Sequence, residues 1–247
     1  MVKVRIGIDI GGSGVKGALV DTNAGTLVSD RVRYDTPKPA TPEGLAAAVG
    51  SLVEKLGGKG PIGIGFPAVL KGGWILTASN IDMSCIGVNA VELFSSATGR
   101  EVFVINDADA AGVGEYRFGA VKDEMGTVII LTFGTGIGSA ILHDGRLIPN
   151  VELGQIELRG IQPAELYFSA KAMTDEGLTW SEWGKRANEF VSHVAALFSP
   201  DRIIVGGGVV SKWEAFADAF DPRLPVAPAA LRKNAGIIGA ASLVANG

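Results

Sequence analysis

Cysteine, histidine and excess positive charge are all scarce in this sequence, and each shortage excludes a class of protein. Cys85 is the only cysteine, so the chain has no internal disulfide. With only His143 and His193 beside it, a Cys/His zinc cluster is also excluded. The 247 residues include 22 basic and 26 acidic side chains, a formal charge of −4. We therefore expect no zinc and no broadly basic surface for nucleic acid.

Long apolar runs are missing as well. None approaches the roughly 20 residues of a membrane span. Strand-like sequence begins at Val4, which leaves no room for a signal peptide. We therefore expect a cytoplasmic protein without a membrane partner. Apolar residues still make up 47% of the chain, which excludes a disordered chain and allows one large domain or two small ones.

Glycine, by contrast, is abundant, with 35 residues against 7% aromatic residues. Three glycine turns each follow a predicted strand: residues 11–14 after 4–10, 134–136 after 127–133, and 206–208 after 203–205. The first two share an apolar strand, a polar residue, an apolar residue, a glycine turn and a return strand. This similarity predicts a weak internal repeat, one copy in each half of the chain.

Strands alternate with helices along the sequence, which indicates an α/β fold. Thr41 followed by Pro42 predicts the start of a helix, with an apolar face of Leu45, Val49, Leu52, Val53 and Leu56. Capping boxes at Thr179–Glu182 and Ser211–Glu214 predict two more helices, the first of them burying apolar residues as far as Leu197. We expect further strands at 15–20, 26–34, 61–66, 102–105 and 139–142, a helix near 91–98, and no clear pattern over 159–178.

The two halves predict two domains. Residues 1–109 would form a smaller N-terminal α/β domain, joined by a C-terminal helix at 234–247. Residues 110–233 would form a larger C-terminal α/β domain.

The first glycine turn has the spacing of a dinucleotide-binding fingerprint at Gly12, Gly14 and Gly17. That fingerprint opens a helix whose N-terminus binds pyrophosphate, whereas Ala18–Asp21 are typical of a strand and a turn. We interpret the match as accidental. Two alternatives remain: plain hairpin turns, or turns whose backbone N–H groups bind phosphate. Repetition of the turn favours phosphate, as do the hydroxyls of Ser13, Thr132 and Thr135 and the charges of Asp9 and Lys16.

Two aspartates follow the predicted strand 102–105, at a strand end where open α/β sheets place ligands. Spacing alone leaves two alternatives for Asp107 and Asp109. Either one of them caps the next helix, or one is the general base for a hydroxyl group.

Glu152, Gln155 and Glu157 lie on a short segment after the second glycine turn. They could bind a polyol or simply face solvent. Cys85 has no base nearby, so we expect a small buried residue there.

Four segments together resemble the ROK family of sugar kinases, and within it the polyphosphate-using branch from actinobacteria. They are Asp9-Ile-Gly-Gly-Ser-Gly-Val-Lys-Gly17, Asn106-Asp-Ala-Asp-Ala-Ala111, Leu131-Thr-Phe-Gly-Thr-Gly-Ile-Gly138 and Glu152-Leu-Gly154. The resemblance covers nearly the whole chain in the same order. It implies an actin-like (ribonuclease H-like) fold, two α/β domains closing on a cleft, and commonly a homodimer.

The activity implied is that of a hexokinase. It would transfer a phosphoryl group from inorganic polyphosphate and/or ATP to the 6-hydroxyl of glucose, with mannose as a second acceptor. By resemblance, Asp107 would be the general base and Asp9 would position Mg²⁺. Donor phosphates would contact Gly11, Gly12, Ser13, Gly14, Lys16, Thr132, Gly134, Thr135 and Gly136, and the base of ATP would lie near Gly207 and Gly208. The sugar would contact Ser79, Asn80, Asn106, Glu152, Gln155 and Glu157.

The sequence departs from its family in two ways. It lacks the cysteine-rich zinc motif of many members, and Gln155 replaces a histidine. In relatives that histidine bonds a hydroxyl on the anomeric side of the sugar and, where zinc is present, ligates the metal. Glutamine offers both a donor and an acceptor, but its extra rotatable bond predicts a looser contact. We expect a raised KM for glucose and weaker discrimination between glucose and mannose.

Two other functions are alternatives to a hexokinase. A ROK repressor that senses sugar needs a helix-turn-helix module ahead of the kinase-like core, and the core here begins by residue 4. A strictly ATP-dependent kinase for another sugar is the closer alternative. Lysines and arginines are scattered, so no basic run in the sequence marks a path for polyphosphate.

Overall fold

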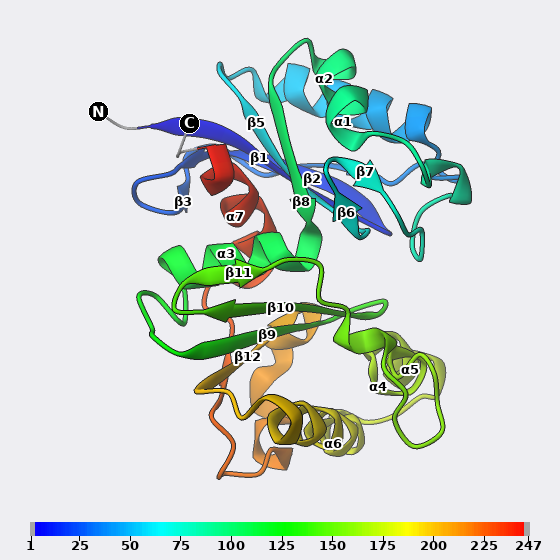
Figure 1. The fold of residues 1–247 in the computed structure, drawn as a ribbon, viewed down its shortest axis with the longest axis vertical. Coiled ribbons are helices and arrows are strands. Elements are labelled where there is room, and N and C mark those ends of the chain that lie inside the picture. Colours follow the sequence, from blue (N-terminus) through cyan, green and yellow to red (C-terminus); the bar gives the residue numbers. More distant parts are fainter. Residues whose placement is uncertain (1–2, 245–247) are drawn as a thin grey trace. The chain divides into compact units, whose positions relative to one another are not determined.

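A computed structural model describes residues 3–244 of the chain, which forms two compact units (Figure 1). Unit 1 runs up to Phe118 and resumes at Asn234, and unit 2 runs from Gly119 to Lys233. The boundary suggested by the sequence, between residues 109 and 110, falls inside helix α3 (Asp107–Phe118) of unit 1. The helix predicted at 234–247 is α7 (Ala235–Leu243), and residues 1, 2 and 245–247 lie outside the described part.

Unit 1 is built on a six-stranded mixed sheet. Its strand order is β3-β2-β1-β5-β8, with β4 also paired to β2. Strands β1, β5 and β8 are parallel, while β1 and β2 form an antiparallel hairpin. The strands are β1 (Val4–Gly11), β2 (Gly14–Asp21), β3 (Thr26–Leu27), β4 (Val32–Asp35), β5 (Ile62–Phe66) and β8 (Val102–Asn106). The other elements are α1 (Pro42–Leu56), α2 (Ala90–Thr98), α3, α7, the small hairpin β6 (Leu70–Lys71) and β7 (Trp74–Ile75), and the 3-10 helix η1 (Met83–Cys85).

The two faces of this sheet differ in side-chain size. One face packs under α1 and α2 with fully buried side chains: Ile6, Ile8, Ile10, Ile62, Ile64 and Phe66. The opposite face carries Gly7 and Gly63, which are paired across β1 and β5. A Cβ atom on Gly7 would overlap the carbonyl oxygen of Ile237, and one on Gly63 would overlap that of Ala240. Helix α7 (red in Figure 1) therefore lies with its own backbone directly against the strands.

Unit 2 contains a five-stranded sheet of order β11-β10-β9-β12-β13. Strands β9 and β10 form an antiparallel hairpin, and β12 and β13 continue the sheet in parallel with β9. The strands are β9 (Thr127–Phe133), β10 (Ile137–His143), β11 (Arg146–Ile148), β12 (Arg202–Gly207) and β13 (Val226–Pro228). The helices are α4 (Glu165–Phe168), α5 (Ala170–Asp175) and α6 (Trp180–Phe198), with 3-10 helices η2 (Leu153–Gln155), η3 (Gly208–Ala215), η4 (Ala217–Ala219) and η5 (Arg232–Asn234), the last ending in unit 1. Each unit thus has a hairpin around a glycine turn next to parallel strands, which confirms the internal repeat.

Two predicted helix starts are confirmed. The Thr41 hydroxyl accepts a hydrogen bond from the Gly44 N–H at 3.2 Å, with Pro42 as the first helical residue. Thr179 and Glu182 form both hydrogen bonds of a capping box at the start of α6. The buried face of α6 ends at Val194, however, and Leu197 is 60% exposed, so the prediction that Leu197 is buried was wrong.

Two local predictions were wrong. Residues 26–34 do not form one strand: the Ser29 hydroxyl takes the place of a backbone acceptor for the Leu19 N–H at 3.0 Å, and β3 and β4 pair separately with β2. No helix begins at Ser211 either. Gly207, at φ +84°, turns the chain so that η3 starts at Gly208, and the Ser211 hydroxyl donates back to the Gly208 carbonyl at 2.9 Å.

The lone cysteine is a core residue. Cys85 is fully buried beneath α1 and α2, which confirms the sequence expectation. Burial raises the pKa of its thiol to about 11, with smaller contributions from Asp82 and Glu43. The thiol therefore stays protonated at neutral pH and is a poor nucleophile. Within residues 3–244 no helix has the length and apolar character to cross a bilayer.

Candidate functional site

The first glycine turn is a tight hairpin. Gly11 pairs with Gly14, so Gly12 and Ser13 alone connect β1 to β2. A strand follows the turn, which excludes the dinucleotide fingerprint, because that motif needs a helix. Asn80 lies against the turn: a Cβ atom on Gly12 would be 3.4 Å from the Cβ of Asn80. Ser79 and Asn80 are both exposed, in the loop between β7 and η1.

Asp9 lies beside this turn with a cation next to it. Asp9 and Lys16 are directly paired across β1 and β2, with Lys16 Nζ 3.7 Å from Asp9 Oδ2. Burial raises the pKa of Asp9, while the positive charges of Lys16 and Arg31 lower it. The first turn of α7 packs on the same carboxylate, since a Cβ atom on Gly236 would be 3.2 Å from Asp9 Cγ.

A glycine brings Asp107 next to Asp9. Gly65 on β5 is the direct partner of Asp9 on β1. A Cβ atom on Gly65 would be 3.4 Å from the Cα of Asp107 and 3.3 Å from the Cβ of Ala110. Because position 65 has no side chain, the start of α3 lies directly over this strand. The structure therefore places Asp107 and Asp9 around one glycine, although they are far apart in the sequence.

Helix α3 is capped by Asn106. Its Oδ1 accepts hydrogen bonds from the N–H groups of Ala108 at 2.9 Å and Asp109 at 3.1 Å. Its Nδ2 donates to the Ala68 carbonyl at 3.2 Å. Asp107 Oδ1 also accepts from the Ala108 N–H at 2.9 Å, while Asp109 is fully buried. The capping role that spacing offered to Asp107 or Asp109 thus belongs mainly to Asn106, and the predicted contact of Asn106 with sugar stays a prediction.

The second and third glycine turns lie side by side in unit 2. Gly206 pairs with Thr132, and a Cβ atom on Gly206 would be 3.2 Å from Thr132 Cγ2. The second turn is closed by a hydrogen bond from the Gly134 N–H to the Gly136 carbonyl at 3.0 Å. A Cβ atom on Gly134 or Gly208 would meet no atom within 4 Å, so both backbones border open space.

The segment that carries Glu152 and Gln155 is fastened to β10. The Ser139 hydroxyl donates to the Val151 carbonyl at 2.6 Å and accepts from the Leu153 N–H at 2.9 Å. These bonds flank Glu152 on both sides and hold η2 beside the second glycine turn. Glu157 is exposed, two residues beyond Gln155.

Glu165 joins this segment to the turn. Its Oε2 accepts a hydrogen bond from the Ile137 N–H at 2.9 Å, and its Oε1 accepts from Gln155 Nε2 at 2.8 Å. A Cβ atom on Gly136 would overlap the same carboxylate. Gln155 is therefore held by Glu165 in the structure, and the looser contact with sugar expected from its extra rotatable bond stays a prediction.

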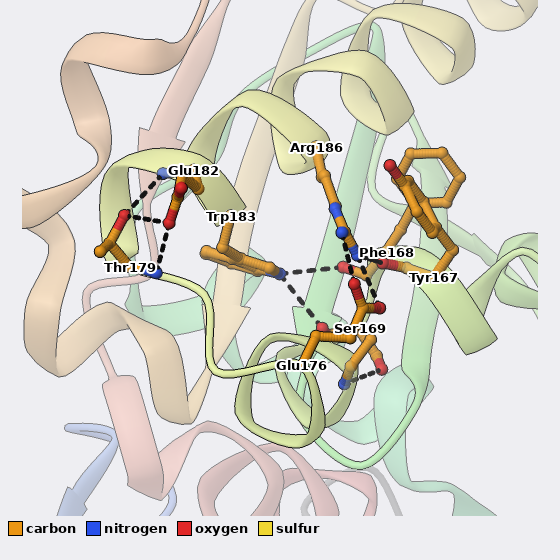
Figure 2. Close-up of polar contacts among 9 residues, drawn as sticks. Tyr167, Phe168, Ser169, Glu176, Thr179, Glu182, Trp183 and Arg186 are labelled. Atoms are coloured by element: carbon orange, nitrogen blue, oxygen red, sulfur yellow. Dashed lines mark hydrogen bonds and ion pairs between the residues drawn. The ribbon is translucent and has the colours of Figure 1, made fainter.

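Sequence reasoning missed Glu165, because residues 159–178 showed no periodicity. Glu165 begins α4, and Figure 2 shows the contacts that the end of α4 makes with α6. Trp183 Nε1 on α6 donates to the carbonyls of Phe168 and Ser169, both at 3.1 Å. Arg186 binds Glu176 and lies 3.8 Å over the ring of Tyr167. These contacts hold α4, which begins at Glu165, against α6.

The carboxylates of unit 1 suit magnesium. Among residues 3–244, no three His, Cys, Asp or Glu side chains gather into a metal-binding group. Mg²⁺ does not need such a cage, since it keeps several waters and takes one or two carboxylates together with substrate phosphates. Asp9, 21% exposed beside a turn of backbone N–H groups, fits that requirement.

Comparison with known proteins gives consistent matches. The model of the ROK family matches residues 5–156. The polyphosphate glucokinase of Mycobacterium tuberculosis is 42% identical over 236 residues, which is 95% of this chain and 89% of the relative.

Solved structures match over almost the whole chain. The inorganic polyphosphate/ATP-glucomannokinase of Arthrobacter sp. strain KM has a TM-score of 0.95 at 44% identity, covering 98% of each chain. A ROK family glucokinase from Streptomyces griseus, solved with glucose and AMPPNP, has a TM-score of 0.86 at 27% identity, covering 99% of this chain and 100% of that one.

Proposed function

Since this chain belongs to the ROK family, we propose that it is a hexokinase that phosphorylates the 6-hydroxyl of glucose from inorganic polyphosphate or ATP. It has the actin-like α/β fold expected of that family. The observation that carries the proposal is the identity of 42% to 44% with a polyphosphate glucokinase and a polyphosphate/ATP-glucomannokinase, over 95% or more of the chain.

Asp107 is the general base in this proposal. It takes the proton from the 6-hydroxyl as that oxygen attacks the terminal phosphorus of the donor, and the shortened donor leaves with the bond electrons. The contact of Asp107 with Gly65, next to Asp9, supports this role. The Ala108 N–H bond to Asp107 Oδ1 fixes the direction of the carboxylate.

In this proposal the glycine turns bind phosphate. Backbone N–H groups of the 11–14 and 134–136 turns form anion-binding concavities, and the hydroxyls of Thr132 and Thr135 add donors. Asp9 would hold Mg²⁺, which neutralises charge on the donor phosphates when bound. Gly207 and Gly208 would receive the base of ATP, with the open space at Gly208 in support.

Asn80, packed against Gly12, and Ser79 are proposed contacts of the sugar. Glu152 and Gln155 are proposed contacts as well, with Glu157 as a further candidate. Mannose as a second acceptor and a homodimer stay predictions from the family resemblance, and a cytoplasmic location stays a prediction from the sequence.

Gln155→His should raise kcat/KM for glucose by about 2- to 13-fold, the worth of one hydrogen bond. A histidine can bond Glu165 through one ring nitrogen and offer the other, on the opposite edge of a rigid ring, to the sugar. Gln155 uses one of its two N–H donors on Glu165 and carries its remaining donor and acceptor on a more flexible side chain. Steady-state kinetics with glucose and mannose measure the change, and the glucose preference should increase. Gln162→His, at an exposed site, is the matched control. Unchanged kcat/KM for both sugars in Gln155→His would remove the side chain from the sugar site.

One assay tests the proposed function as a whole. Purified protein is incubated with Mg²⁺, glucose and either ATP or polyphosphate, and glucose 6-phosphate is measured with a coupled dehydrogenase. We expect product with polyphosphate and with ATP. Product from another sugar, with ATP alone, would instead establish a strictly ATP-dependent ROK kinase.

A further inference from the structure

A row of charged side chains crosses the sheet of unit 1 beside the first glycine turn. Asp9 on β1 pairs with Lys16 on β2, and Lys16 pairs with Arg33 on β4. Directly paired residues project from the same face of a sheet, so the three side chains form one line. Neighbouring strands are about 4.8 Å apart, which puts the backbone of Arg33 about 10 Å from that of Asp9.

The guanidinium of Arg33 is fixed at the turn itself. Its Nη2 donates to the Ser13 carbonyl at 2.8 Å. A Cβ atom on Gly14 would be 2.8 Å from Arg33 Nε, so the absence of a side chain at position 14 is what lets the guanidinium lie there. A second cation therefore borders the turn, on the side away from Asp9.

Arg33 pairs with the carboxylate of Asp35, on the same strand, but remains accessible to an anion. Arg33 Nη1 pairs with Asp35 Oδ1 at 2.7 Å, but the two side chains are 46% and 84% exposed. Exposed ion pairs of this kind contribute little free energy, so a multiply charged ligand can replace Asp35. A guanidinium has five N–H donors, of which the Ser13 and Asp35 bonds use two.

The charged row has a defined order relative to Asp107. Asp107 lies over Gly65 on β5, on one side of Asp9, and Lys16 and Arg33 lie on the other side. A polyphosphate chain whose terminal phosphate faces Asp107 and that follows this row passes Lys16 and then reaches Arg33. A nucleoside triphosphate has no further phosphate to place there, whereas inorganic polyphosphate remains anionic along its whole length.

We propose that Arg33, next to the phosphate-binding Lys16, forms a subsite for the tail of inorganic polyphosphate, the part of the donor beyond the phosphates that ATP also has. The proposal rests on the proposed function for the position of the reacting phosphate. Arg33 then distinguishes the two donors: it adds affinity for long polyphosphate and contributes little to ATP.

Arg33→Gln tests the subsite through kinetics. We expect the KM for long-chain polyphosphate to rise by roughly 3- to 10-fold, the effect of one exposed charge-assisted contact. The KM for tripolyphosphate and for ATP should stay close to the wild-type values, and Arg33→Lys should restore much of the long-chain affinity. Arg223→Gln is the matched control, since Arg223 also pairs with an aspartate two residues away and lies in unit 2. A rise of the same size for every donor would mean that Arg33 only supports the turn, and the subsite would be rejected.

Direct binding separates this proposal from the proposed function. Long-chain polyphosphate is titrated into wild-type and Arg33→Gln protein without sugar, at two salt concentrations. Weaker binding and a smaller salt dependence in the variant support the subsite even if the wild type fails to transfer phosphate from polyphosphate. Equal binding by both proteins overturns it, whatever the activity assay shows.

Discussion

Asp107→Asn lowers kcat by about 10²- to 10⁴-fold while glucose binding survives. Asparagine keeps the shape of the side chain, and its Oδ1 can still accept the Ala108 N–H that Asp107 accepts at 2.9 Å. The amide cannot take a proton from the 6-hydroxyl, so only the chemical step suffers. Initial rates with saturating glucose and donor give kcat, and calorimetric titration gives the affinity for glucose.

Asp21→Asn is the matched control for this variant. Asp21 ends β2 in the same unit, and its Oδ1 likewise accepts a backbone N–H, that of Asn23 at 2.9 Å. Its kcat should equal the wild-type value. A folded Asp107→Asn protein that turned over at the wild-type rate would mean that another group takes the proton.

Gly63→Ala should lower the free energy of unfolding of unit 1 by about 3 kcal/mol or more, the upper end of the cost of overpacking. The added methyl group would overlap the carbonyl oxygen of Ala240 in α7. Both partners are backbone, so no side-chain rotation can relieve the overlap, and the whole helix must move off the sheet. Scanning calorimetry should show the transition of unit 1 lowered by roughly 6 to 12 °C.

Gly50→Ala, in α1 of the same unit, provides the comparison. Its added Cβ atom would be 3.3 Å from the Ala97 carbonyl oxygen, a tight but tolerable contact. Helix propensity favours alanine there by about 1 kcal/mol, so the stability should change by about 1 kcal/mol at most. Equal transition temperatures for the two variants would show that α7 can shift on the sheet at no cost.

The strands were predictable, but the use of their second face was not. Isoleucines at alternate positions of Val4–Gly11 and Ile62–Phe66 indicate strands with one buried face. The glycines between them look like weak strand formers. Their role depends on α7, which begins at Ala235, whereas β5 ends at Phe66, and no local sequence pattern links segments so far apart.

The candidate site also has residues that the sequence predicts and residues that it does not. Asp107 could be found because it follows a strand end, and the glycine turns because they repeat. Glu165 could not be found, since its bonds to Ile137 and Gln155 depend on how α4 packs against α6. Arg33 also escaped notice, because only the register of β2 with β4 shows that it lies in line with Lys16 and Asp9.

Helix α7 belongs to unit 1 but follows unit 2 in the sequence, so during translation unit 1 can be completed only after unit 2 has been synthesised. Unit 2 is a continuous stretch, Gly119 to Lys233, and leaves the ribosome before α7 does. Until residues 235–243 emerge, Gly7 on β1 and Gly63 on β5 lack the helix that packs on them, and so does the carboxylate of Asp9. A nascent chain at that stage can contain a folded unit 2 while unit 1 still lacks α7.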